Sequence, residues 1–122
     1  MSVTVSITQI NPIVGSFKQN LQMVADAIVN VKSDHADAIV FPELALTGYP
    51  PEDLLFRPIF IQKVEDTLQQ IAKLSVGIAT IIGAPVIRGD KLYNMACIRI
   101  TKRAFDKDRR YPITSHYRWN LT

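Results

Sequence analysis

The sequence has a single cysteine, Cys97, among its 122 residues. One thiol forms neither an internal disulfide nor a cysteine-based zinc site, so we expect a metal-free protein of the cytoplasm. Long apolar runs are also missing: the longest, residues 76–87, has about 12 residues, whereas a membrane span needs about 20. The N-terminus lacks the basic segment and the apolar segment after it that form a secretory signal. We therefore expect no membrane association.

Before the end of the chain, neither positive nor negative charge is in large excess. Residues 1–98 hold seven Lys/Arg against nine Asp/Glu, a net charge of −2, whereas residues 99–122 hold seven against two, a net charge of +5. Aromatic side chains alternate with these basic ones, as in proteins that bind single-stranded nucleic acid. A solvated charged tail explains the pattern more simply, so a basic nucleic-acid-binding protein stays an alternative and nucleic acid is not the expected partner.

The first 42 residues predict a strand, a helix and a second strand. Alternation at Val3, Val5 and Ile7 is typical of a half-buried strand. Apolar residues at helical spacing predict a helix over residues 17–32, started by a capping box from Ser16. The continuous apolar run of residues 37–42 predicts a strand covered on both faces. This order is typical of a βαβ unit, whose two strands are parallel.

The second half predicts one more helix and a hairpin. Glycine and prolines make residues 43–53 a loop, and Pro58 suits the first turn of a helix. Residues 80–100 resemble a β-hairpin, and no convincing pattern follows Ile100. We therefore expect one α/β domain over residues 1–98 and a basic tail over residues 99–122, without a predicted element.

Glu43 is the candidate for acid–base chemistry. It follows the apolar run of residues 39–41 and precedes Leu44, at the carboxyl end of a predicted strand, where open α/β sheets place their ligands. A carboxylate among apolar neighbours loses hydration, and it can then accept and return a proton near neutral pH. Position alone favours the alternative, a solvated surface glutamate.

The residues around Glu43 form a more specific pattern, Phe-Pro-Glu-Leu-Ala-Leu-Thr-Gly-Tyr-Pro-Pro-Glu-Asp-Leu-Leu over residues 41–55. This stretch resembles the nitrilase superfamily of carbon-nitrogen hydrolases, and within it the N-terminal glutaminase domains of glutamine-dependent NAD synthetases. Other stretches agree with the resemblance: residues 9–15, Asn20, residues 83–85 and residues 92–94. The resemblance covers roughly residues 3–98.

The resemblance implies part of a nitrilase-type αββα sandwich and a Glu-Lys-Cys triad. In that family the cysteine attacks a carboxamide carbon, the glutamate is the general base, and the lysine stabilises the charge on oxygen. Glu43 matches the family glutamate, and Tyr49 matches a tyrosine near the glutamine pocket. Ammonia from glutamine would pass to a synthetase domain that uses ATP and amidates nicotinate adenine dinucleotide. No cofactor is implied for the present chain.

The sequence also departs from the family. The family lysine lies in a Lys-x-x-Leu-Pro segment, which this sequence lacks, and Cys97 lies in a predicted strand interior that does not match the nucleophile. Cys97 is better explained as a small buried hydrophobe. We therefore expect a truncated, catalytically incomplete chain.

Two alternatives remain open besides the nucleic-acid binder. The chain could be a fragment of another nitrilase-family amidase, although the Tyr-Pro-Pro-Glu-Asp continuation at residues 49–53 argues against this. It could also be a non-catalytic, oligomerising protein. An incomplete sandwich leaves an apolar sheet face uncovered, so we expect a homo-oligomer or self-association.

Overall fold

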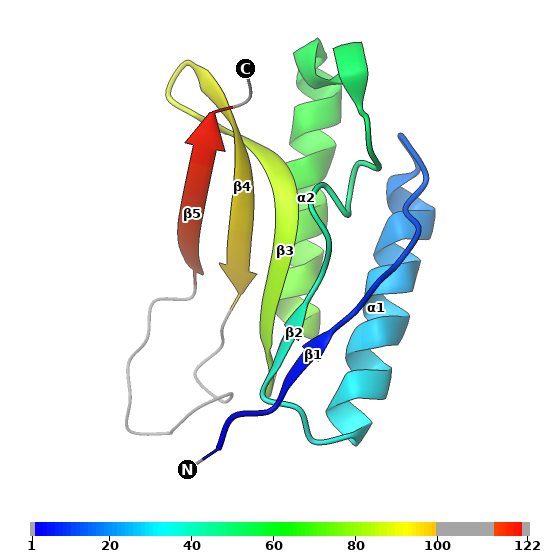
Figure 1. Cartoon of the computed structure of the whole chain (residues 1–122). Helices are drawn as coiled ribbons and strands as arrows, with labels where there is room; N and C mark the ends of the chain where they lie inside the picture. The colour runs from blue at the N-terminus through cyan, green and yellow to red at the C-terminus, as the bar shows by residue number, and fades with distance from the viewer. Residues whose placement is uncertain (1, 100–113, 121–122) are drawn as a thin grey trace.

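The computed structural model describes residues 2–99 and, for the backbone alone, residues 114–120. The elements are β1 (Val5–Ile7), α1 (Phe17–Ser33), β2 (Ala38–Val40), the 3-10 helix η1 (Glu52–Phe56), α2 (Pro58–Leu74), β3 (Ala79–Arg88), β4 (Lys91–Arg99) and β5 (Thr114–Asn120). The strands form one sheet in the order β1-β2-β3-β4-β5 (Figure 1). The predicted α/β class is confirmed.

Strand directions follow the sequence predictions. β1, β2 and β3 run parallel to one another, as expected of a βαβ unit, while β3 and β4 form the predicted antiparallel hairpin. β5 pairs with β4 in a segment for which the sequence predicts no element. The other expectations for the basic tail fall on residues 100–113, which lie outside the described part of the chain.

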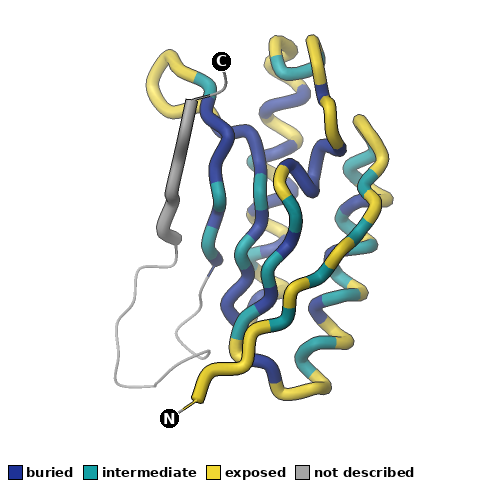
Figure 2. Tube along the Cα trace, viewed as in Figure 1, coloured by how far each residue is buried: buried dark blue, intermediate teal, exposed yellow. Residues whose placement is uncertain are grey.

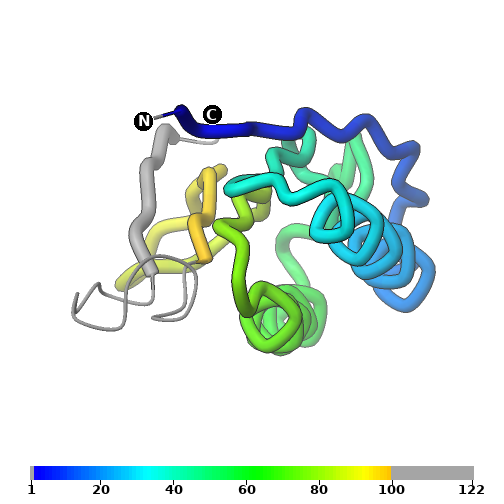
Figure 3. Tube along the Cα trace, turned by 90° about the horizontal axis from the view of Figure 1, so that it is seen from below, coloured from blue at the N-terminus to red at the C-terminus, as the bar shows by residue number. Residues whose placement is uncertain are grey.

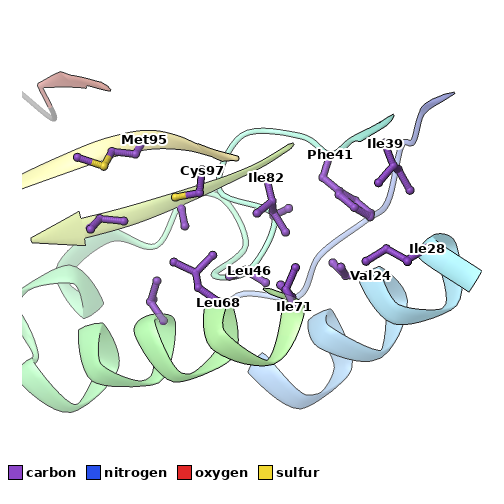
Figure 4. Close-up of a cluster of buried hydrophobic side chains, with 14 of the residues drawn as sticks. Val24, Ile28, Ile39, Phe41, Leu46, Leu68, Ile71, Ile82, Met95 and Cys97 are labelled. Atoms are coloured by element: carbon purple, nitrogen blue, oxygen red, sulfur yellow. The ribbon is translucent and has the colours of Figure 1, made fainter. Parts of the chain in front are cut away.

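Both helices lie on one face of the sheet, as the view along the strands shows (Figure 3). Each helix buries an apolar stripe at helical spacing, including Val24 and Ile28 of α1 and Leu68 and Ile71 of α2. Ile82 and Cys97 of the sheet belong to the same core, and both side chains are fully buried (Figure 4). Burial of these side chains is the main force that holds the helices on the sheet.

Strand register separates the two faces of the sheet. Ile82 pairs with Cys97 and Ala84 pairs with Met95, and all four belong to the core under the helices. Successive side chains in a strand point to opposite faces. The intervening residues therefore face away from the helices, in three registered pairs: Ile81 with Ile98, Gly83 with Ala96, and Pro85 with Asn94. We call this side the far face.

The first strand departs from the prediction that its apolar residues are buried. Val5 is 51% and Ile7 80% exposed, whereas Ser6 between them is half-buried. Figure 2 accordingly colours β1 as exposed and intermediate, without a buried residue. Ile7 pairs with Val40, which pairs with Ile81. Register thus directs the apolar residues of β1 to the far face, in a row that crosses three strands, and directs Ser6 towards the helices.

The start of α1 also differs from the prediction. The Ser16 hydroxyl donates to Oε1 of Gln19 at 2.8 Å instead of accepting from a backbone amide, so no capping box forms.

Among the described residues, no helix is long and apolar enough to cross a bilayer.

Candidate functional site

Glu43 lies in a turn that leaves β2 and crosses to the neighbouring strand. The amide of Phe41 donates to the carbonyl of Ile81 at 2.8 Å, and the amide of Ala45 donates to the carbonyl of Gly83 at 3.2 Å. The chain thus continues to bond β3 after β2 has ended, with Glu43 between the two contacts. The turn contains one left-handed residue, Leu44, with φ of 51°.

Gly83 permits this turn to lie close against the sheet. A Cβ on Gly83 would lie 2.7 Å from the amide nitrogen of Leu44 and 2.8 Å from Cα of Glu43, closer than real side chains approach. Its registered partner on the far face is Ala96, which also carries little bulk. Two small residues side by side therefore leave room on the sheet for the backbone of Glu43.

The Glu43 carboxylate has one polar partner from β4. Nδ2 of Asn94 donates a hydrogen bond to Oε1 of Glu43 across 51 residues of sequence. Asn94 is only 2% exposed, and its Oδ1 is buried without a hydrogen-bond partner among the described residues. The bond therefore joins the flexible side chain of Glu43 to the buried side chain of Asn94, which is held in the sheet.

Glu43 and Asn94 line a cavity of about 170 Å³. The other lining residues are mostly apolar: Val40, Phe41, Ile81, Gly83, Met95 and Ala96. Such a cavity suits a small group that carries a few polar atoms. The prediction that Glu43 is desolvated is wrong, because its side chain is exposed while Phe41 and Leu44 on either side are buried.

The loop that follows Glu43 is fixed by Asn20 of α1, which is fully buried. Its Nδ2 donates to the carbonyls of Ile13 and Leu46, at 2.8 Å each, and its Oδ1 accepts from the amide of Ile13 at 2.7 Å. Gly48 lets the two loops touch, since a Cβ there would lie 2.6 Å from the backbone of Val14. These contacts explain why residues 9–15, Asn20 and Gly48 occur together among the stretches that carry the family resemblance.

Tyr49 lies apart from the cavity. Its side chain is 70% exposed, and it is not among the described residues that line the space beside Glu43. Its role near a substrate stays a prediction.

Cys97 does not serve Glu43 as a nucleophile in this arrangement. Its side chain is fully buried on the helix side of the sheet, paired with Ile82, whereas Glu43 approaches Gly83 and Asn94 of the far face. Burial also raises the pKa of the Cys97 thiol from 9.0 to about 11, which keeps it protonated at neutral pH. The prediction that Cys97 is a buried hydrophobe is confirmed.

A second cavity, of about 410 Å³, lies between the first turns of α1 and α2. Arg57 and Lys63 line it together with Phe17 and Phe60, whose rings are 5.0 Å apart. No group of acidic, histidine or cysteine side chains within the described residues could hold a metal ion.

Sequence reasoning missed the roles of Gly83 and Asn94. Both lie in stretches that contribute to the resemblance, but their proximity to Glu43 follows from strand register. One signal was present: Asn94 is a polar residue in an otherwise apolar strand interior, where an amide needs a partner.

The chain is similar to curated glutamine-dependent NAD(+) synthetases. The relative from Xylella fastidiosa (strain Temecula1 / ATCC 700964) is 38% identical over 95 residues, which are 77% of this chain and 17% of the relative. The relative from Synechocystis sp. is 33% identical over an alignment that covers 87% of this chain and 23% of the relative. The chain thus spans less than a quarter of the length of these relatives.

Solved structures agree. The glutamine-dependent NAD+ synthetase from Acinetobacter baumannii superposes with a TM-score of 0.73 at 32% identity, over 77% of this chain and 18% of that one. An amidase from Nesterenkonia sp. has a TM-score of 0.72 at 19% identity, over 80% of this chain and 38% of that one, a likeness of fold alone.

A family model for carbon-nitrogen hydrolases matches residues 4–118. The match includes the turn with Glu43 and the hairpin with Asn94, and it extends past the domain boundary predicted at residue 98 into β5. The chain therefore belongs to the carbon-nitrogen hydrolase family.

Proposed function

We propose that this chain is the N-terminal part of the glutamine-hydrolysing domain of a glutamine-dependent NAD synthetase. The identity of 33–38% to such synthetases supports the proposal. The single structural observation that carries it is the placement of Glu43, held by a hydrogen bond at a small, mostly apolar cavity where β2 ends.

In this proposal Glu43 is the general base. Its carboxylate takes the proton of a cysteine thiol, so that the thiolate can attack the amide carbon of glutamine, and it later activates the water that hydrolyses the thioester. Cys97 does not supply that thiol, because it is buried in the core on the helix side of the sheet. The nucleophile therefore belongs to another part of the enzyme, as does the charge-stabilising lysine, because this sequence lacks the Lys-x-x-Leu-Pro segment.

Several narrower statements belong to the same proposal. Glutamine is the substrate, Tyr49 lies near its binding pocket in the assembled enzyme, and the reaction takes place in the cytoplasm. This portion needs no metal or organic cofactor, and ATP is used by the synthetase domain alone. The single, unpaired Cys97 supports a reducing compartment.

We also propose that the isolated chain self-associates through the far face of the sheet. Val5 and Ile7 are exposed there beside Val40 and Ile81. Apolar side chains that gather on one surface favour association.

A chimera tests the proposed function. The N-terminal segment of the Xylella fastidiosa relative is replaced by the matching segment of this chain, and NAD formation is measured with glutamine or with ammonium as the nitrogen source. We expect glutamine-dependent synthesis, and we expect Glu43→Gln to abolish it while ammonium-dependent synthesis continues. Ammonium-dependent activity is the control for folding of the synthetase part.

Two outcomes would contradict the proposal. One is a chimera that uses ammonium and binds glutamine but does not hydrolyse it. The other is glutamine-dependent synthesis that survives Glu43→Gln unchanged. The first outcome would show that this chain is not the matching part of a glutamine-hydrolysing domain, and the second that Glu43 is not the base.

A further inference from the structure

Asn94 has a hydrogen-bonding arrangement that its own strand does not explain. It lies in the interior of β4, paired with Pro85 of β3 and Trp119 of β5, and its side chain is 2% exposed. Its Nδ2 bonds Glu43, whereas its Oδ1 is buried with no hydrogen-bond partner in the part of the chain that the structure describes. An unsatisfied buried carbonyl oxygen destabilises the fold, so an apolar residue of the same shape would suit the strand better.

The contact with Glu43 explains why an amide is useful at this position. A glutamate side chain has several freely rotating bonds, and Glu43 is exposed, so packing does not hold its carboxylate. The backbone of Glu43 is fixed by its close approach to Gly83. The donor from Asn94 then fixes the far end of the same side chain, because Asn94 itself cannot move within the sheet.

We propose that Asn94 is a positioning residue for Glu43. Its Nδ2 donates a hydrogen bond to Oε1 of the Glu43 carboxylate, and Oε2 is left as the oxygen that exchanges protons with the reacting groups. This proposal rests on the proposed function of Glu43, and it deepens that function by assigning the two carboxylate oxygens different tasks. A productive geometry is held within narrow limits by such supporting contacts.

The two possible roles of Asn94 predict different results for Asn94→Leu. Leucine has nearly the shape of asparagine, but it removes both the donor and the unsatisfied oxygen. If Asn94 positions Glu43, the variant folds with equal or higher stability, while the Glu43 side chain loses its preferred rotamer. If Asn94 serves the strand alone, the variant is less stable and the Glu43 rotamer does not change.

Nuclear magnetic resonance on the full 122-residue chain measures these quantities. Scalar couplings report the side-chain rotamers of Glu43, and the carboxamide signals of Asn94 report its hydrogen bond. We expect one dominant Glu43 rotamer in the unchanged chain and an average over several rotamers in Asn94→Leu. An unchanged rotamer preference in Asn94→Leu, or an averaged one in the unchanged chain, would overturn the proposal.

A second pair of variants tests the bond from the other side. Glu43 is exposed, so substitutions there leave the core intact. We expect Glu43→Gln, which keeps an accepting oxygen, to preserve the Asn94 carboxamide signals and their slow hydrogen exchange, and Glu43→Ala to shift them and lose that protection. Equal effects of the two variants contradict the proposal. Because these readouts need no catalysis, they separate a failure of the positioning role from a failure of the proposed function.

Discussion

Gly83 lies directly against the backbone of Glu43: a Cβ on Gly83 would come within 2.8 Å of Cα of Glu43. We predict that Gly83→Ala displaces this turn and lowers the free energy of unfolding by about 1–3 kcal/mol, the usual cost of overpacking. Urea denaturation measures the stability, and amide chemical shifts of Glu43 and Leu44 report the displacement. Gly77→Ala is the control for the amide shifts: a Cβ there meets no atom within 4 Å, so the variant strains the backbone at φ of 87° without crowding the turn. Unmoved shifts in Gly83→Ala would show that the turn is not built on this contact.

Asn20 joins two loops through three hydrogen bonds made by one fully buried side chain. We predict that Asn20→Ala lowers the free energy of unfolding by about 2–4 kcal/mol, because backbone groups of Ile13 and Leu46 lose their partners. Chemical denaturation gives the energy, and amide exchange of residues 13–15 gives the local effect. The exposed Asn30 on the same helix offers a matched control, Asn30→Ala, for which a change below about 0.5 kcal/mol is expected. Similar losses for the two variants would contradict the assignment.

Cys97 makes stability depend on pH in the alkaline range. Burial raises its pKa from 9.0 to about 11, so the folded chain holds the thiol proton more tightly than the unfolded chain. The resulting stabilisation is complete below the pKa of the thiol in the unfolded chain. It is lost as the pH rises towards the pKa of the thiol in the folded chain, and the free energy of unfolding falls by up to about 2–3 kcal/mol. Denaturation at about pH 8 and about pH 10.5 measures the loss. Cys97→Ala removes this contribution, and an equal pH dependence in that variant would refute the explanation.

The isolated chain should not hydrolyse glutamine. When a member of a catalytic triad is missing, the rate of the reaction falls by orders of magnitude, so Glu43 alone is not expected to suffice. Ammonia release by the purified 122-residue chain, compared with Glu43→Gln, measures any activity. Steady release that disappears in Glu43→Gln would mean that this chain contains a complete site.

Self-association should depend on β1. Ile7, which is 80% exposed on the far face, is expected to contact a second copy, so Ile7→Lys should shift the chain towards monomer in sedimentation velocity. Val29→Lys is the control, since Val29 is 65% exposed on α1, which packs on the opposite face of the sheet. A monomeric unchanged chain would contradict the prediction.

Local patterns were sufficient to predict most elements. Helical spacing predicted both helices, and the hairpin was predicted by apolar segments on either side of a turn at Gly89 and Asp90. The faces of β1 were not predictable, because alternation shows that Val5 and Ile7 share a face but not which face meets the helices. β5 was missed because the alternation in its sequence, Thr-Ser-His-Tyr-Arg-Trp-Asn, is limited to two aromatic residues among basic and polar ones, a pattern that also suits a charged tail.

The candidate site was predicted only in part. The position of Glu43 at a strand end was predictable, since it follows from the local pattern and the order of elements. Its partner was not, because Asn94 lies 51 residues away and meets Glu43 through the pairing of β3 with β4. Contacts at such separation depend on register, which the sequence of a single strand does not encode.

The strand pairings also differ greatly in the loops that they close. Arg88 and Lys91 pair across a two-residue turn, whereas Val5 and Ala38 pair only after the whole of α1 intervenes. Short loops close at lower entropic cost and faster. During folding we therefore expect the β3–β4 hairpin to gain protection from pulse-labelled hydrogen exchange before β1, and Glu43 to reach its final position among the last residues to do so.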